Sequence, residues 1–529
     1  MRTTTLLAPL ALLAAALVSA SPTPRDIQAR WAFPGEVNVL TATVKDLQEF
    51  LSNGTITSVQ LTQHYLDLIG NNNFDGLNLR AVIETAPYDS VMAIAQAFDE
   101  ERANGTMRSG LHGIPMLFKA KLGMNTTAGG FALLGSVVPG DAPVVAKLRK
   151  AGVIVIGKAS LSQYANFKGN ITNGWNARSG QGQSAYVVGG FEAGGDPCGS
   201  SSGSGIGVSA GFAAAALGSE TDGSIICPSN RAALYGIKMS VGLSSRSGVI
   251  PISSTQDTTG PMAKSAYDAA LILENMVGYD VNDTATYDAV NHTQTNYTQY
   301  TMSPYATFQG MKLGVPREGF FNETLSGNPP EINIAVDAAI AKIQSLGASI
   351  QDPANLPTFN DYLYSGNETI VLQNDFKVDF GNYMSQLISS PVRTLEDVIN
   401  FNDAHADIEF APGECCQQTM VASFGTPGTN SSEYLAARAA DLAIGSGIDT
   451  VLDQYGLDAL VLPSEGFATG PPAIVGYPIV TVPLGTLNAT GAPFGLSFIG
   501  RKWSEPTLIA LMAAFEANFP PRAVPSQLM

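Results

Sequence analysis

Two stretches rich in serine and glycine hold hydroxyl groups that could act as nucleophiles. The first, DPCGSSSGSG at 196–205, contains four serines, and the second, GSETDGSIICPS at 218–229, contains three. A serine is a poor nucleophile at its free pKa, so either stretch would need a base beside it. The chain has only four histidines, scattered singly along 529 residues. A base other than histidine therefore has to be considered.

The first stretch contains a motif that is typical of α/β-hydrolases. Gly-x-Ser-x-Gly occurs around Ser201 and again around Ser209. Such a nucleophile directly follows a strand, whereas the residues before Ser201, GGFEAGGDPC, are typical of a loop. The lysine-based pair Ser-x-x-Lys is absent from the sequence. A serine esterase that uses Ser201 or Ser209 with His292 or His405 stays open as an alternative.

The second stretch places Ser224 between a turn, ETDG, and an apolar run, IIC, that resembles the start of a strand. Successive backbone N–H groups in such a turn can converge on an anion. Ser224 is therefore the second candidate nucleophile.

The elements around these serines alternate between helices and strands. Apolar residues at helical spacing, with a break at Asn-Gly, predict two amphipathic helices over 43–69 and a third helix near 87–103. A short apolar strand is expected in HGIPMLFKA, and 144–157 reads as a helix, a glycine and a strand. Strand-like segments return at 457–464 and 477–485. This alternation predicts an α/β fold.

Two stretches of low charge resemble membrane spans, and neither fits one. Residues 1–20 begin with Arg2, continue with LLAPLALLAAALV and end in small residues, which is typical of a secretory signal cut after Ala20. Its apolar run is too short to cross a bilayer. Residues 200–219 carry no charge, but their Gly, Ala and Ser content favours a tightly packed buried helix.

Composition points to a secreted, acidic protein. The net charge of -17 and the pI near 4.6 predict a surface that repels nucleic acids and anionic membranes. Sequons of the form Asn-x-Ser/Thr suit a secretory route. They lie at Asn53, Asn104, Asn125, Asn170, Asn282, Asn291, Asn296, Asn322, Asn367, Asn430 and Asn488.

The four cysteines are too few for a disulfide scaffold, although secretion would permit bridges. Bridges between Cys198 and Cys227, or between Cys415 and Cys416, are left open by the sequence. No zinc-ligand spacing is found, so metal catalysis is not expected.

Four motifs in order resemble the amidase signature family. They are LHGIPMLFKAKLGMNTTAGG at 111–130, DPCGSSSGSG, GSETDGSI and PFGLSFIGR at 493–501. The resemblance covers most of the chain and is weakest from about 290 to 450. It implies a large mixed central β-sheet flanked by helices, one domain over 21–529 with a variable substrate-side region at about 290–450, and no cofactor.

The resemblance also implies the catalytic residues, a triad of serine, cis-serine and lysine. The lysine falls on Lys119, the serine that follows a glycine through a cis peptide falls on Ser200, and the nucleophile falls on Ser224. The oxyanion donors are then the backbone N–H groups of Thr221, Asp222, Gly223 and Ser224. A lysine that burial keeps neutral can act as a base, and Lys119 follows an apolar strand.

The chain departs from the family pattern at several positions, none of them catalytic. Ala120 replaces an aspartate, Cys198 and Ser202 replace glycines, Asp222 takes a glycine position, and Ile226 stands where many members have arginine. We therefore expect an active enzyme with altered local hydrogen bonding. Ile226 and the segment NDYLYSGN favour either an apolar acyl group in the substrate or a packing role in the core.

The sequence is interpreted as a secreted amidohydrolase that cleaves a small-molecule amide through a serine acyl-enzyme. Nucleic acid, cofactor and membrane span are not expected. The family's subunits of a transfer-RNA amidotransferase have partners that are not secreted, so the signal peptide argues against that role. Besides the serine esterase, a non-catalytic secreted glycoprotein that keeps only the fold is the other alternative.

Overall fold

The computed structural model describes residues 33–35, 37–119, 124–411 and 416–529, and an eleven-stranded mixed β-sheet runs through its centre. In order across the sheet, the strands are β1 (Val82–Thr85), β3 (Ile154–Ala159), β2 (Pro115–Phe118), β6 (Ala215–Glu220), β8 (Thr258–Ala263), β7 (Tyr235–Lys238), β12 (Ile479–Thr486), β13 (Pro493–Ile499), β11 (Ala459–Pro463), β9 (Lys312–Gly314) and β10 (Ser349–Gln351). β2 pairs in parallel with β3 and β6, and β9 with β10 and β11, whereas the other neighbours are antiparallel. The predicted large mixed sheet is confirmed.

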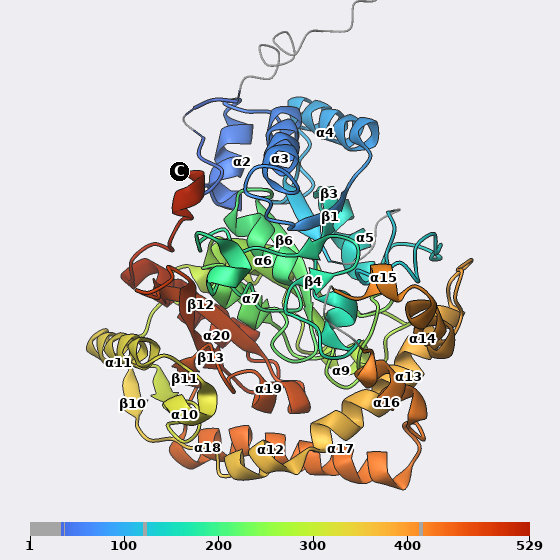
Figure 1. Cartoon of the computed structure of the whole chain (residues 1–529). Coiled ribbons are helices and arrows are strands. Elements are labelled where there is room, and N and C mark those ends of the chain that lie inside the picture. Colours follow the sequence, from blue (N-terminus) through green and yellow to red (C-terminus); the bar gives the residue numbers. More distant parts are fainter. Residues whose placement is uncertain (1–32, 36, 120–123, 412–415) are drawn as a thin grey trace, which may run out of the picture.

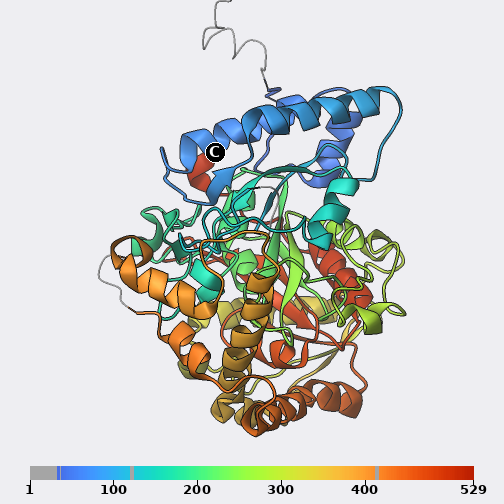
Figure 2. The same ribbon diagram turned by 90° about the vertical axis from the view of Figure 1, so that its right-hand side faces the viewer.

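Helices cover the sheet on its faces and ends. They include α2 (Val44–Ser52), α3 (Ser58–Asn72), α4 (Tyr88–Ala103), α5 (Pro143–Lys150), α6 (Ser202–Ser209), α7 (Ile226–Arg231), α8 (Ala266–Glu274), α11 (Pro330–Ser345), α12 (Phe359–Ser365), α13 (Asn367–Ser385), α14 (Leu395–Ala404), α16 (Gln418–Gly425), α17 (Ser432–Gly445), α18 (Gly447–Tyr455), α19 (Gly470–Val475) and α20 (Glu505–Asn518). Helices α2 to α4 lie across one end of the molecule, and α12, α17 and α18 lie across the opposite end (Figures 1 and 2). In the described ranges, no helix is both long and apolar enough to cross a membrane.

The helices predicted over 43–69 and 87–103 are present as α2, α3 and α4. Capping boxes start the first two: the Thr43 side chain accepts a hydrogen bond from the N–H of Asp46, whose side chain accepts one from the N–H of Thr43. Thr57 and Gln60 form the same reciprocal pair before α3. These caps satisfy backbone donors that the first turn of a helix leaves free.

The prediction of a single buried helix over 200–219 is wrong, because the stretch contains a helix and a strand. Helix α6 ends at Ser209, and β6 begins at Ala215. Gly211 between them has φ +71°, a left-handed conformation that a helix cannot continue. Within α6, a Cβ on Gly203 would come within 2.4 Å of the backbone of Ser160, so the small residues permit close packing of α6 on the chain after β3. The need for close packing, rather than a single long helix, explains why 200–219 is rich in Gly, Ala and Ser.

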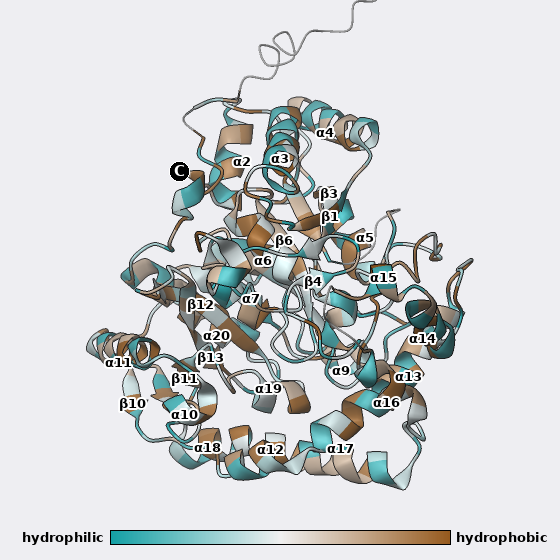
Figure 3. Cartoon of the chain, in the orientation of Figure 1, coloured by the Kyte–Doolittle hydropathy of each residue, from teal (hydrophilic) through white to brown (hydrophobic). Residues whose placement is uncertain are grey.

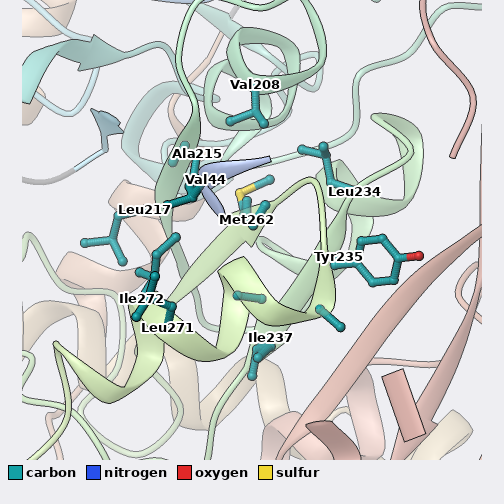
Figure 4. Packing of buried hydrophobic residues seen from close by; sticks show 14 of the residues in the cluster. Val44, Val208, Ala215, Leu217, Leu234, Tyr235, Ile237, Met262, Leu271 and Ile272 are labelled. Carbon is teal, nitrogen blue, oxygen red and sulfur yellow. The ribbon is translucent and has the colours of Figure 1, made fainter. Parts of the chain in front are cut away.

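The core lies between the sheet and its covering helices. Figure 4 shows Leu217 of β6, Met262 of β8 and Ile237 of β7, with Leu271 and Ile272 of α8 packed nearby, and all five are buried in one cluster. Along the strands the ribbon is mostly hydrophobic, whereas outer helices such as α17 carry both hydrophobic and hydrophilic residues (Figure 3). This burial fixes the ends of the strands that the candidate site residues follow.

Candidate active site

Lys119 directly follows β2 and contacts the first serine stretch. Its Nζ donates a hydrogen bond of 2.6 Å to Ser200 Oγ and one of 3.3 Å to the carbonyl of Ser219. The Lys119 N–H bonds to the carbonyl of Leu217, which continues the parallel pairing of β2 with β6 by one residue. The sheet therefore sets the position of the lysine relative to the residues that follow β6.

The protonation of Lys119 is shifted by its surroundings. Although part of the residue stays accessible, burial of its ammonium group among protein atoms lowers its pKa to about 7. The negative charges of Asp257 and Glu220 partly oppose this decrease. Near neutral pH, a substantial fraction of Lys119 is then an uncharged amine that can accept a proton.

Ser200 is fully buried and is held by its backbone. The peptide bond between Gly199 and Ser200 is cis, and the Ser200 carbonyl accepts a hydrogen bond of 3.1 Å from the N–H of Ser162. A Cβ on Gly199 would lie 2.3 Å from Ser162 Oγ, so only glycine fits there. The Ser200 hydroxyl oxygen is the acceptor of the hydrogen bond from Lys119 Nζ.

Cys198, which replaces a glycine of the family pattern, keeps a backbone that favours glycine. Its φ is +56°, and its N–H donates a hydrogen bond of 2.8 Å to Asp196 Oδ1. Its sulfur forms a disulfide with Cys227, with 5.8 Å between the Cα atoms. This bridge, which the sequence left open, joins the two serine stretches covalently. Cys415 and Ala120 lie outside the described residues.

Ser224 stands at the end of a tight turn that follows β6. Gly223 in this turn has φ +77°. No described residue accepts a hydrogen bond from the backbone N–H groups of Thr221, Asp222, Gly223 and Ser224. The Ser224 carbonyl accepts a hydrogen bond of 3.1 Å from the N–H of Ser201, which connects the turn to the first stretch. The turn thus offers four backbone donors beside a nearly buried hydroxyl.

The apolar run after Ser224 is a helix, α7, and not the strand that the sequence suggested. Glu220 explains how the turn passes into this helix: its Oε2 accepts hydrogen bonds of 2.5 Å from the N–H of Ile225 and 2.9 Å from that of Ile226. The carboxylate therefore satisfies donors at the start of α7 and closes the turn around Ser224.

Charged side chains near the turn partly offset one another's pKa shifts. Burial raises the pKa values of Glu220 and Asp222, and the nearby Lys238 partly opposes both increases. Burial lowers the pKa of Lys238 to about 8, and its ammonium donates to the carbonyls of Pro472 and Tyr477. Asp222 takes the place of a family glycine. A hydrogen bond with Thr469 also opposes the increase in its pKa.

A cavity of about 630 Å³ opens beside Ser200 and the start of the turn. Its walls mix apolar and polar groups, including Ser200, Thr221, Arg246, Ile250, Ile252, Asp257, Asp379 and Tyr383. Ile226 does not line it and packs instead in the core with Phe320 and Phe359. Tyr362 contacts Phe359 and Phe467, and Tyr364 is 77% exposed. The packing role, rather than an acyl pocket, describes Ile226 and Tyr362, whereas Tyr364 faces solvent.

The hydroxyls of the two serines in the alternative esterase site are bonded to backbone groups. Ser201 Oγ bonds to both backbone groups of Ser219, and Ser209 Oγ donates to the carbonyl of Ile206. His292 stacks on Trp503, and His405 contacts Phe401. In the part of the chain that the structure describes, no histidine is hydrogen-bonded to either serine. Ser204 Oγ donates to the Leu217 carbonyl, so Ser201 and Ser204 attach α6 to β6.

Asp257 is a site residue that sequence reasoning missed. Its Oδ1 accepts a hydrogen bond of 2.6 Å from Thr221 Oγ1, and its charge acts on Lys119. Burial raises the pKa of Asp257 to about 6. In the sequence, Asp257 is marked only by its position directly before the strand β8. Single aspartates at such positions are too common to indicate a site. Among the described residues, no group of three or more His, Cys, Asp or Glu side chains could hold a metal ion.

Comparisons with known proteins agree with the geometry. The family model named Amidase matches residues 78–472. A protein of Arabidopsis thaliana named as a probable amidase is 36% identical over 488 residues, which cover 90% of each chain. The crystal structure of the native peptide amidase from Stenotrophomonas maltophilia has a TM-score of 0.84 and 36% identity, over 92% of this chain and 98% of that one.

A second solved structure, of an amidase family protein from Bacillus anthracis, has a TM-score of 0.83 and 31% identity, over 92% of this chain and 93% of that one. The residues that the family model matches include β2, the two serine stretches and Lys119. The chain therefore belongs to the amidase signature family and is an amide-hydrolysing enzyme.

Proposed function

We propose that the enzyme is a secreted amidohydrolase that cleaves carboxamides through an acyl-enzyme on Ser224, with Ser200 and Lys119 completing the triad. The observation that carries this proposal is the 2.6 Å contact between Lys119 Nζ and Ser200 Oγ, made by a lysine whose pKa is about 7. A serine activated in this way needs no histidine.

In the proposed reaction, Ser224 Oγ attacks the amide carbonyl while its proton passes to Ser200, and the Ser200 proton passes to the amine of Lys119. The unoccupied N–H groups of the turn at 221–224 stabilise the oxyanion. The proton returns through Ser200 to the leaving nitrogen, the C–N bond breaks, and ammonia or an amine departs. Water then hydrolyses the ester on Ser224 by the same proton path in reverse.

Peptide amides are the substrates that we propose to test first. The solved peptide amidase shares 36% identity with the chain. The cavity of about 630 Å³ beside Ser200 lies in the size range of ligand sites and has both apolar and hydrogen-bonding walls. Such walls suit an acyl group that carries side chains and backbone polar groups, more than a simple alkyl amide.

The test is a panel of peptide carboxamides, alkyl and aryl amides of graded length, and the matching esters. We expect ammonia release from the carboxamides, measured by a coupled assay, with peptide amides giving the highest kcat/KM. Hydrolysis of the esters alone would contradict the proposal and support a serine esterase. Hydrolysis of no amide or ester would favour a protein that keeps only the fold.

We also propose that the chain enters the secretory route, on the basis of the signal at 1–20 and the sequons. Nine of the eleven sequon asparagines are exposed, namely Asn53, Asn104, Asn170, Asn282, Asn291, Asn296, Asn322, Asn430 and Asn488. The other two, Asn125 and Asn367, are partly buried. Exposed sequons are accessible to the glycosylating enzyme, so most sites suit this route.

Asn125 is expected to carry no glycan, although its sequon is complete. Its Nδ2 donates to Glu84 Oε2 at 3.3 Å, and it lines a small cavity that Lys119 also lines. A glycan on this nitrogen would break the contact and enter the site. We expect glycopeptide mapping of the protein secreted from a eukaryotic host to find glycans at Asn291 or Asn296 and none at Asn125. Full occupancy of Asn125 in active enzyme would contradict the placement.

A further inference from the structure

Helix α13 carries three acidic residues on one face. Glu368, Asp375 and Asp379 are seven and four residues apart, a spacing that brings their side chains to one side of a helix. Helix α13 belongs to the region at about 290–450 where the family resemblance is weakest. Its acidic stripe, as we call these three residues, meets the loop at 253–256 that precedes β8.

Each residue of this loop is bound by the acidic stripe. Asp375 Oδ2 accepts hydrogen bonds of 2.6 Å from Ser253 Oγ and 2.9 Å from Thr255 Oγ1. Asp379 Oδ2 accepts one of 2.6 Å from the N–H of Ser254, and Glu368 Oε1 accepts one of 2.8 Å from Gln256 Nε2. Asp375 is the central contact: its side chain is fully buried, and it holds two hydroxyls at once.

The loop leads directly to the oxyanion turn. Asp257, its next residue, turns back so that Oδ2 accepts hydrogen bonds of 2.8 Å from the N–H of Ile252 and 3.0 Å from that of Ser253. The other oxygen, Oδ1, accepts the 2.6 Å hydrogen bond from Thr221 Oγ1. A continuous series of hydrogen bonds therefore runs from Asp375 through the loop and Asp257 to the turn at 221–224.

We propose that Asp375 is a positioning residue for amide hydrolysis: it fixes the loop at 253–256 and, through Asp257, the oxyanion turn. This proposal rests on the proposed role of that turn. Oxyanion donors act on charge that develops only in the transition state, so a small displacement of the turn lowers kcat more than it weakens substrate binding. Loss of the Asp375 carboxylate removes the acceptor of the buried Ser253 hydroxyl and of the half-buried Thr255 hydroxyl, and it releases the loop.

The experiment compares Asp375→Ala with a matched control, Asp268→Ala. Asp268 on α8 is also fully buried and also accepts two hydrogen bonds, from the N–H groups of Val44 and Lys45, but these hold α2. We expect Asp375→Ala to lower kcat by roughly 10- to 100-fold, because misplaced catalytic groups have effects of this size. KM should rise by a smaller factor, since Ser254 of the loop and Asp257 also line the cavity. Asp268→Ala should lower the melting temperature and leave kcat of the folded protein nearly unchanged.

Two further variants test the role of the carboxylate oxygen. Both hydroxyls donate to the same oxygen of Asp375, so the amide oxygen in Asp375→Asn can accept both, and we expect it to recover most of kcat. Thr255→Val removes one donor and keeps the other, and it should lower kcat in the same direction by a smaller factor. This variant decides the matter if Asp375→Ala does not fold.

Hydrogen–deuterium exchange supplies a measurement that does not depend on activity. Exchange of the Ile225 and Ile226 amides, which donate to Glu220 at the end of the turn, should be faster in Asp375→Ala, or in Thr255→Val, and unchanged in Asp268→Ala. Variants of Asp375 and Thr255 that change only the melting temperature, with normal kcat and normal exchange at these two amides, would overturn the proposal. If the wild-type enzyme cleaves no amide, the proposed function fails, whereas the exchange data still decide whether Asp375 holds the turn.

Discussion

Ser224→Ala is expected to lower kcat by at least ~10³-fold, as loss of a covalent nucleophile does in serine hydrolases. The hydroxyl that it removes stands at the end of the turn, beside four N–H groups that donate to no described residue and can bind the oxyanion. KM should change little, because the methyl group of alanine fits the same space. The measurement is ammonia release at saturating peptide amide, with the enzyme concentration set by absorbance.

Ser209→Ala is the matched control for Ser224→Ala. Ser209 is buried in α6, and its hydroxyl donates only to the Ile206 carbonyl, so its loss should leave kcat within about twofold. Ser200→Ala should be nearly as severe as Ser224→Ala, since it interrupts the contact with Lys119. A Ser224→Ala enzyme that keeps more than a tenth of the wild-type rate would remove Ser224 from the nucleophile role, and a harmless Ser200→Ala would remove the relay.

Lys119→Ala is expected to lower kcat by at least ~10²-fold and to change the pH profile, since it removes the proposed general base. In the wild type, Lys119 is protonated below its pKa of about 7 and cannot accept a proton, so kcat/KM should rise as pH increases through that region. The apparent pKa of this limb belongs to the coupled Lys119, Ser200 and Ser224 system. In Lys119→Ala the limb should flatten or move.

Lys264→Met provides a control with the same titration at a distant place. Burial lowers the pKa of Lys264 to about 7 as well, but its ammonium donates to the carbonyls of Val39 and Ala42, beside α2. If the limb reports on catalysis, it persists in Lys264→Met and is lost in Lys119→Ala. An unchanged rate and profile in Lys119→Ala would show that another group is the base, and histidine would have to be reconsidered.

Elements with a clear period could be predicted from the sequence, and those made of small residues could not. The amphipathic pattern over 43–69 and the apolar runs at 457–464 and 477–485 correspond to α2, α3, β11 and β12. Over 200–219 the small residues carry no period, so the division at Gly211 depends on packing against the rest of the chain. The same holds after Ser224, where Glu220 supplies the acceptors that start α7.

The residues of the candidate site come from distant parts of the sequence, so local patterns do not identify them. Lys119 and Ser200 are separated by 81 positions, and only the resemblance to a family selects this pair before a structure is known. Thr221 is 36 positions from Asp257, and Ser253 is 122 positions from Asp375. Single acidic residues at such separations have no pattern of their own, because the sheet and α13 bring them together only in the folded chain.

The Cys198–Cys227 bridge also acts on the chain before it folds. It closes a ring that contains Ser200, all of α6 and β6, and Ser224, with 29 positions between its cysteines. In a chain-entropy account, closing a ring of this length lowers the conformational entropy of the unfolded chain. This loss stabilises the folded state by about 3–4 kcal/mol. Once the bridge forms, the unfolded chain has fewer conformations in which the two serines lie far apart. A peptide bond cut inside the ring also leaves both serines on one covalent molecule.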